Sequence, residues 1–108
     1  MDIWIEIEKL KGQTLRTLEQ QKAFEILEVS SKEILILPRS TKIKRPIQRE
    51  GIENAYRHLL TTGQITVKEI EDNYTPRSQV YTATILAKLP EVYLSIRPIR
   101  LWMKTKEK

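Results

Sequence analysis

The hydrophobic pattern of this chain changes its period near Arg49, and this change constrains the fold more than any other feature. Before that point, apolar residues recur at every second position, as in half-buried strands. After it, an apolar stripe of helical spacing appears at Ile52, Ala55, Tyr56, Leu59 and Leu60. The sequence therefore predicts an α+β protein in which the strands precede the helices.

The first 48 residues are predicted to form an antiparallel β-meander, which could curl into a small barrel. Strands are expected at residues 3–10, 14–18, 23–29, 33–37 and 41–47, separated by short polar turns. The apolar alternation shifts between Ile26 and Leu27, which indicates a bulge. Pro46 has no amide hydrogen to donate, so the last of these strands should lie at the edge of the sheet.

Three helices are predicted after residue 49. Gly63 is placed to stop the first one, because glycine readily adopts the left-handed conformation that follows many helices. Thr66 and Glu69 fit a capping box at the start of the second helix, which should run to about Asn73.

The third helix is expected to begin at Thr75-Pro76, because threonine can cap a helix and proline suits its first position. It should run to Leu89, where Pro90 stops it. A segment of strand-like composition follows, with an internal proline. Three short helices and such a tail resemble a winged helix-turn-helix module over roughly residues 49–102. In these modules the last helix enters the major groove of DNA, which implies DNA binding by the third helix.

The third helix has one narrow polar stripe, because apolar residues occupy most of its helical wheel. Side chains of these types can contact base edges or phosphates. The predicted nucleic-acid-binding residues of this helix are Arg77, Tyr81, Thr84 and Lys88, with Ser78 and Gln79 in the first turn.

The positive charge of the chain, +5 overall, is concentrated in two blocks. Residues 39–49 contain five basic and no acidic side chains, and residues 91–108 carry five basic and two acidic ones, a net charge of +3. Concentrated positive charge attracts polyanions. Lys42, Lys44 and Arg45 are therefore predicted to hold the nucleic-acid backbone beside the third helix.

Two other functions fit the same residues. The chain could be a protein-protein interaction or accessory module with Trp4, Tyr93 and Trp102 as anchors, because aromatic residues dominate interface hot spots. A specific version is a homodimer formed through the edge of the 3–10 strand. The N-terminal sheet could instead bind RNA by stacking bases on Phe24 or Trp4 beside basic residues.

Catalytic, metal and cofactor sites are not expected. The chain has no cysteine and a single histidine, which excludes a zinc site built from several of these residues. Its three glycines form no phosphate-binding loop. His58 falls on the polar face of the first helix, where we expect it to be exposed and without a catalytic partner.

The sequence also predicts how the chain is divided and where the protein is located. We expect a β-rich subdomain at 1–48 and a helical subdomain at 49–102 that share one core, with a disordered basic tail at 103–108. The first ten residues alternate apolar and charged side chains, unlike a signal peptide, and no apolar run is long enough for a membrane span. A cytoplasmic protein without a membrane partner is the expectation.

Overall fold

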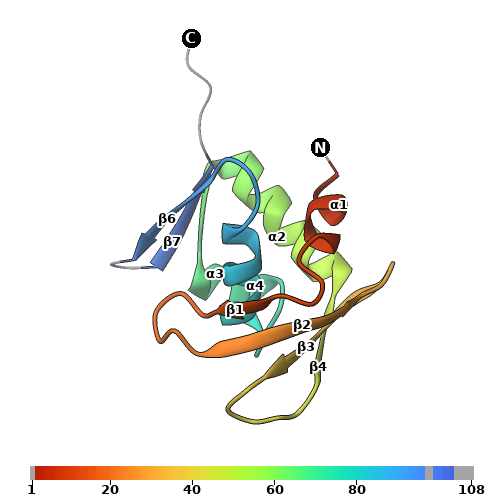
Figure 1. Cartoon of the computed structure of the whole chain (residues 1–108). Coiled ribbons are helices and arrows are strands. Elements are labelled where there is room, and N and C mark those ends of the chain that lie inside the picture. The colour runs from red at the N-terminus through yellow and green to blue at the C-terminus, as the bar shows by residue number, and fades with distance from the viewer. Residues whose placement is uncertain (1, 97–98, 104–108) are drawn as a thin grey trace.

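The N-terminal half forms a four-stranded antiparallel sheet, as the computed structural model shows for a chain described over residues 2–96 and 99–103 (Figure 1). Its strands lie in sequence order and are β1 (Thr14–Arg16), β2 (Ala23–Val29), β3 (Glu33–Pro38) and β4 (Arg45–Gln48). The predicted meander is therefore confirmed, and β4 is an edge strand as Pro46 indicated. The predicted bulge is also present, because the pairing of β2 with β3 shifts between Ile26 and Glu28.

Helices and a second, smaller sheet follow. The elements in order are α2 (Arg49–Thr62), β5 (Gln64–Thr66), α3 (Val67–Asn73), α4 (Gln79–Ala87), β6 (Val92–Ile96) and β7 (Ile99–Met103). The second sheet has the order β5-β7-β6, so that β7 pairs antiparallel with both neighbours. The α+β class is confirmed, with four helices in the described residues where the sequence predicted three.

The additional helix is α1 (Ile3–Glu8), and it replaces the strand predicted at residues 3–10. The Asp2 side chain caps it by accepting a hydrogen bond of 2.9 Å from the Trp4 amide. Ile3 and Ile7 stand one turn apart and are both buried, whereas Ile5 is 55% exposed. The alternating sequence thus also satisfies a helical stripe. With no strand here, the predicted dimer through a 3–10 strand edge has no basis.

Two other predicted elements are shorter than expected. The strand predicted at 41–47 is β4 alone, because Lys42 has a left-handed backbone with φ of 58° that interrupts an extended chain. Helix α4 begins at Gln79 instead of Pro76, since Arg77 is also left-handed, with φ of 72°. The helix ends at Ala87, two residues before the predicted Leu89.

The predicted helix caps are present at Gly63 and Thr66. Gly63 follows α2 in the left-handed conformation, with φ of 85°. The Thr66 hydroxyl accepts from the Glu69 amide at 3.1 Å, and a Glu69 carboxylate oxygen accepts from the Thr66 amide at 2.9 Å, which completes the capping box.

Helix α2 approaches the segment before α4 very closely at Gly51. A β-carbon placed on Gly51 would lie 2.7 Å from a Thr75 side-chain carbon and 2.8 Å from the Tyr74 carbonyl oxygen. Both distances are below ordinary van der Waals contact, so glycine permits this packing. The contact fixes the Tyr74–Thr75 turn, and thus the start of α4, against the first turn of α2.

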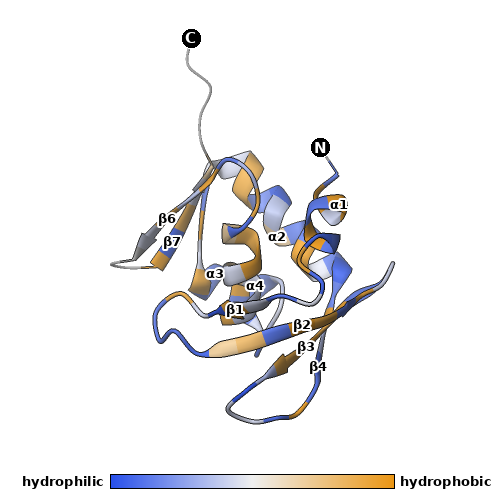
Figure 2. Ribbon diagram, viewed as in Figure 1, coloured by the Kyte–Doolittle hydropathy of each residue, from blue (hydrophilic) through white to orange (hydrophobic). Residues whose placement is uncertain are grey.

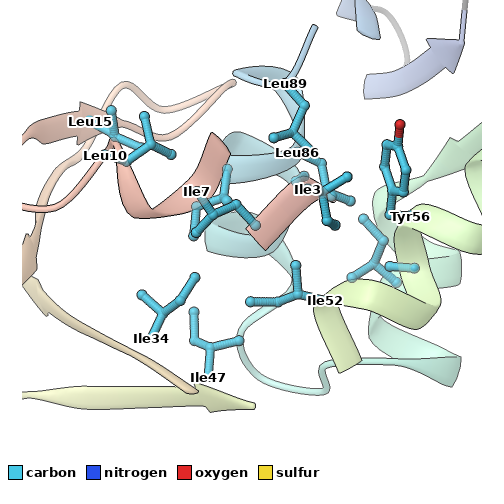
Figure 3. Close-up of a cluster of buried hydrophobic side chains, with 14 of the residues drawn as sticks. Ile3, Ile7, Leu10, Leu15, Ile34, Ile47, Ile52, Tyr56, Leu86 and Leu89 are labelled. Atoms are coloured by element: carbon cyan, nitrogen blue, oxygen red, sulfur yellow. The ribbon is translucent and has the colours of Figure 1, made fainter. Parts of the chain in front are cut away.

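A single cluster of buried hydrophobic residues draws on α1, both sheets and the other helices. Figure 2 shows hydrophobic residues of α1 and α4 in the middle of the molecule. In Figure 3, Ile34 and Ile47 from the large sheet lie beside Ile52 of α2, and Ile7 of α1 lies near Leu86 of α4. The core thus connects the two predicted subdomains.

The last predictions concern the ends of the chain. Met103, assigned to the disordered tail, is part of β7, and residues 104–108 lie outside the described residues. Within the described part of the chain, no helix has the length and apolar character needed to cross a membrane.

Candidate nucleic-acid interface

The middle of α4 is enclosed on all sides. Five consecutive residues, Thr82 to Leu86, are buried, and at 100° per residue they cover the whole circumference of the helix. The Thr82 hydroxyl forms a buried hydrogen bond of 2.8 Å with the Thr75 hydroxyl. The Tyr81 ring meets the Phe24 ring of β2 edge-on, with centroids 5.0 Å apart. Helix α4 therefore packs against the large sheet as well as against the other helices.

The polar stripe predicted on this helix is consequently not an exposed face. Ser78 and Thr84 are 6% and 1% exposed, and the Thr84 hydroxyl donates to the Val80 carbonyl at 2.9 Å. Gln79 and Tyr81 are half-buried, and the Gln79 Oε1 atom is enclosed without a hydrogen-bond partner among the described residues. The expected exposure was wrong for Ser78 and Thr84. Thr84 tolerates burial because its hydroxyl bonds to its own helix.

Arg77 and Lys88 are exposed but lie at opposite ends of α4. The nine residues of α4 that lie between them rise by roughly 14 Å. Lys88 therefore belongs to the end of α4 that leads to β6. Only Arg77 lies at the end that faces the β3–β4 loop.

Arg45 joins Arg77 to the basic loop between β3 and β4. The Arg45 guanidinium donates to the Arg77 carbonyl oxygen at 3.3 Å, and it lies over the Tyr81 ring, 5.8 Å from the centroid. Arg45 and Arg77 are 32 residues apart in the sequence. Arg45 thus makes a cation-π contact with the Tyr81 ring, and this contact holds Arg45 next to Arg77.

The residues around this contact form what we call the basic surface. Its members are Arg39, Lys42, Lys44, Arg45 and Arg77. All are exposed except the half-buried Arg45, and none forms an ion pair with a carboxylate among the described residues. A shallow cleft of about 290 Å³ runs beside Lys44 and Arg45, lined also by Thr41, Ile43 and Pro46.

Sequence reasoning missed Arg39 as a member of the basic surface. The Arg39 amide donates to the Ala23 carbonyl at 3.0 Å, which continues the β2–β3 pairing and fixes Arg39 at the base of the loop. The exposed Lys22 precedes Ala23 and so lies at the same end of the sheet. The register of the β2–β3 hairpin could have identified both residues, because it places Arg39 beside Ala23 and therefore close to Lys22.

His58 differs from its predicted exposed state. Its side chain is 20% exposed, and its Nδ1 atom lies 2.8 Å from the Tyr74 hydroxyl. The Nε2 atom is 3.8 Å from a carboxylate oxygen of Glu69, which is itself held by the capping box. This arrangement attaches α3 to α2. Nowhere in the described residues do three or more histidine, cysteine or acidic side chains gather as metal ligands.

The aromatic residues named as possible anchors divide into two groups. Trp4 is 3% exposed, its Nε1 donates to the Ser30 carbonyl at 2.8 Å, and Phe24 is fully buried. Neither the Trp4 ring of α1 nor the Phe24 ring of β2 is therefore free to stack on a base. Tyr93 and Trp102, in contrast, are 53% and 39% exposed on the small sheet.

Comparison with protein-family models, with curated protein sequences and with solved structures finds no match to this chain. The functional argument therefore rests on the geometry described above.

Proposed function

We propose that this protein binds DNA, and that the basic surface holds the sugar-phosphate backbone. The observation that carries the proposal is the Arg45–Arg77 hydrogen bond, because it brings Arg77 onto one surface with the basic 39–45 segment, which is distant in sequence. Several positive charges on one surface, without acidic partners, are typical of a protein that binds a polyanion.

The arrangement of the C-terminal half also supports the proposal. The element order α2, β5, α3, α4, β6, β7, with β7 between β5 and β6, resembles that of a winged helix-turn-helix module. In that comparison α4 corresponds to the helix that reads bases in such modules.

The burial of α4 limits how the DNA can be read. Since Thr82 to Leu86 are enclosed, the middle of the helix has no free face to place in a groove. Arg77, just before the helix, is exposed. Binding would therefore depend mainly on phosphates, which position a protein on DNA without specifying sequence.

The direct test is a fluorescence-anisotropy titration of labelled duplexes of two unrelated sequences at several salt concentrations. If all five cations of the basic surface each contact one phosphate, the log-log salt slope is about −4.5, and affinity falls by roughly 500-fold between about 50 and 200 mM salt. We expect similar affinities for the two sequences. Absence of duplex binding at low salt would contradict the proposal.

Duplex-binding measurements on single variants test whether the basic surface is the binding surface. Arg77→Ala and Lys42→Ala should each weaken binding and make the salt slope less steep by about 0.9. Lys32→Ala is the matched control, because Lys32 is equally exposed but lies at the opposite end of β3 from the basic loop. An equal loss in all three variants would point to overall charge instead of this surface.

A further inference from the structure

The small sheet presents a second surface, on a different side of the molecule from the β3–β4 loop (Figure 1). Its inner face carries Ile65 and Leu101, which are buried and are direct partners across β5 and β7. Because side chains alternate along a strand, the neighbouring positions point outward. The outward side chains include Gln64, Thr66, Tyr93, Ser95, Arg100 and Trp102.

Two exposed aromatic rings stand next to each other on this outer face. Tyr93 of β6 and Trp102 of β7 are direct cross-strand partners, so their β-carbons are about 5 Å apart. They are 53% and 39% exposed. Bases of single-stranded nucleic acids stack on exposed aromatic rings of this kind.

Arg100 adds a positive charge beside the rings. Its guanidinium carbon lies 5.4 Å from the Trp102 ring centroid, and it has no carboxylate partner among the described residues. Its partners across the sheet, Ser95 and Thr66, are uncharged. The sequence from 91 to 108 carries a net charge of +3, and this positive charge would attract a phosphate backbone.

The size of the face favours a nucleic-acid strand over a folded partner. Two five-residue strands and the three-residue β5, spaced about 4.8 Å apart with a rise of about 3.3 Å per residue, cover about 200 Å². A stable protein-protein interface needs about 800 Å² on each partner. A face of this size accommodates a few unpaired nucleotides.

We infer that the outer face of the β5-β7-β6 sheet binds single-stranded nucleic acid, with bases stacked on Tyr93 and Trp102 and a phosphate held by Arg100. Stacking is tolerant of sequence, because every base has an aromatic face. This surface is separate from the basic surface proposed for duplex DNA, and either could exist without the other.

Tryptophan fluorescence gives a specific test. The chain has two tryptophans, and Trp4 is 3% exposed, so Trp102 is the tryptophan on which a base of unlabelled oligo(dT) or oligo(U) can stack. Both oligonucleotides should quench the fluorescence of the wild-type protein. Trp102→Phe should keep binding, measured by anisotropy of labelled oligonucleotide, but lose the quenching. Quenching that persists in this variant overturns the inference.

Affinity measurements on further variants complete the test. Tyr93 is 53% exposed on the edge strand β6, and Tyr93→Ala should weaken single-strand binding by about 5- to 150-fold while leaving duplex binding unchanged. Arg100→Ala should make the salt slope for single strands less steep by about 0.7. Leu60→Ala, at an exposed apolar position on α2, is the control.

Three further outcomes would overturn the inference. They are no single-strand binding at low salt, wild-type affinity in Tyr93→Ala, and a dimer that Tyr93→Ala dissociates in a protein that binds no oligonucleotide. The last result would assign the face to a second copy of the chain. Loss of duplex binding alone, as in Arg77→Ala, would concern only the basic surface.

Discussion

The Tyr81 ring of α4 meets the Phe24 ring of β2 at an interplanar angle of 72°, with the centroids 5.0 Å apart. Edge-to-face pairs of this kind are favoured by the charge distribution of aromatic rings. The same Tyr81 ring supports the Arg45 guanidinium. One side chain thus connects the packing of α4 on the large sheet with the placement of the basic surface.

Replacing Tyr81 should affect stability and DNA binding together. Tyr81→Ala removes the ring from a half-buried site, so we expect a loss of about 2–3 kcal/mol in the free energy of unfolding. It also removes the support of Arg45, and duplex binding should weaken in the fraction that remains folded. Tyr81→Phe keeps the ring and serves as the control. Urea unfolding followed by circular dichroism measures the stability, and equal stabilities of the two variants would contradict this account.

The buried hydroxyls of Thr75 and Thr82 should be energetically coupled. Thr75→Val leaves the Thr82 hydroxyl without its partner in the interior, which should cost about 1–3 kcal/mol. The double variant with Thr82→Val removes both polar groups, and its cost should be clearly smaller than the sum of the two single costs. A double-mutant cycle in urea measures the coupling. Strict additivity would show that the two hydroxyls do not depend on each other.

Gly51→Ala should destabilise the protein although it raises helix propensity. Alanine in place of glycine favours a helix by about 1 kcal/mol. The new methyl group would, however, lie 2.8 Å from the Tyr74 carbonyl oxygen, and overpacking of this kind typically costs about 1–3 kcal/mol. Because the obstacle includes backbone, we expect the clash to exceed the gain. Glu50→Ala, at the exposed preceding position, is the control for a change in the same helical turn. A higher midpoint of thermal unfolding in Gly51→Ala would contradict the prediction.

Tyr56 should make the protein less stable at alkaline pH. Burial raises the pKa of its phenol above the ordinary value of 10.0, and the nearby Glu91 carboxylate raises it further. Above pH 10 the unfolded chain therefore loses this proton before the folded chain does. The contribution of Tyr56 to stability is fully present below pH 10 and is lost as the pH rises through the folded-state pKa.

The matching variant is Tyr56→Phe, which has no phenolic proton. The free energy of unfolding of the wild-type protein should fall more steeply above pH 10 than that of Tyr56→Phe, and the two slopes should agree near pH 8. Urea titrations at a series of pH values measure both slopes. Parallel curves across the alkaline range would show that the phenol does not titrate differently on folding.

Several elements could be predicted from the sequence because each of them depends on residues that are close together in the chain. The Thr66–Glu69 capping box, the Gly63 stop and the bulge near Ile26 are of this type. The error at residues 3–10 came from a pattern that satisfies both periods, since Ile3 and Ile7 fit a strand and a helix alike. Asp2 was the overlooked local signal, because aspartate is a favoured helix cap.

The candidate site was harder to predict because it depends on contacts between distant residues. A helical wheel shows which side chains share a face of α4, but it does not show that β2 covers that face through Phe24. The Arg45–Arg77 contact joins positions 32 residues apart, which neither the strand period nor the helix period connects. The charge of the 39–49 block was visible in the sequence, whereas its position beside the start of α4 required the tertiary structure.

The enclosure of the middle of α4 has a consequence for the motions of the protein. Amide hydrogens in the middle of a helix exchange with solvent only when the helix opens, and α4 between Thr82 and Leu86 cannot open without separating the surrounding core. Their exchange should therefore proceed through global unfolding and be among the slowest in the chain, whereas the exposed loop around Lys42 and Lys44 should exchange through small local openings. The middle of α4 should therefore be among the last segments of the chain to open.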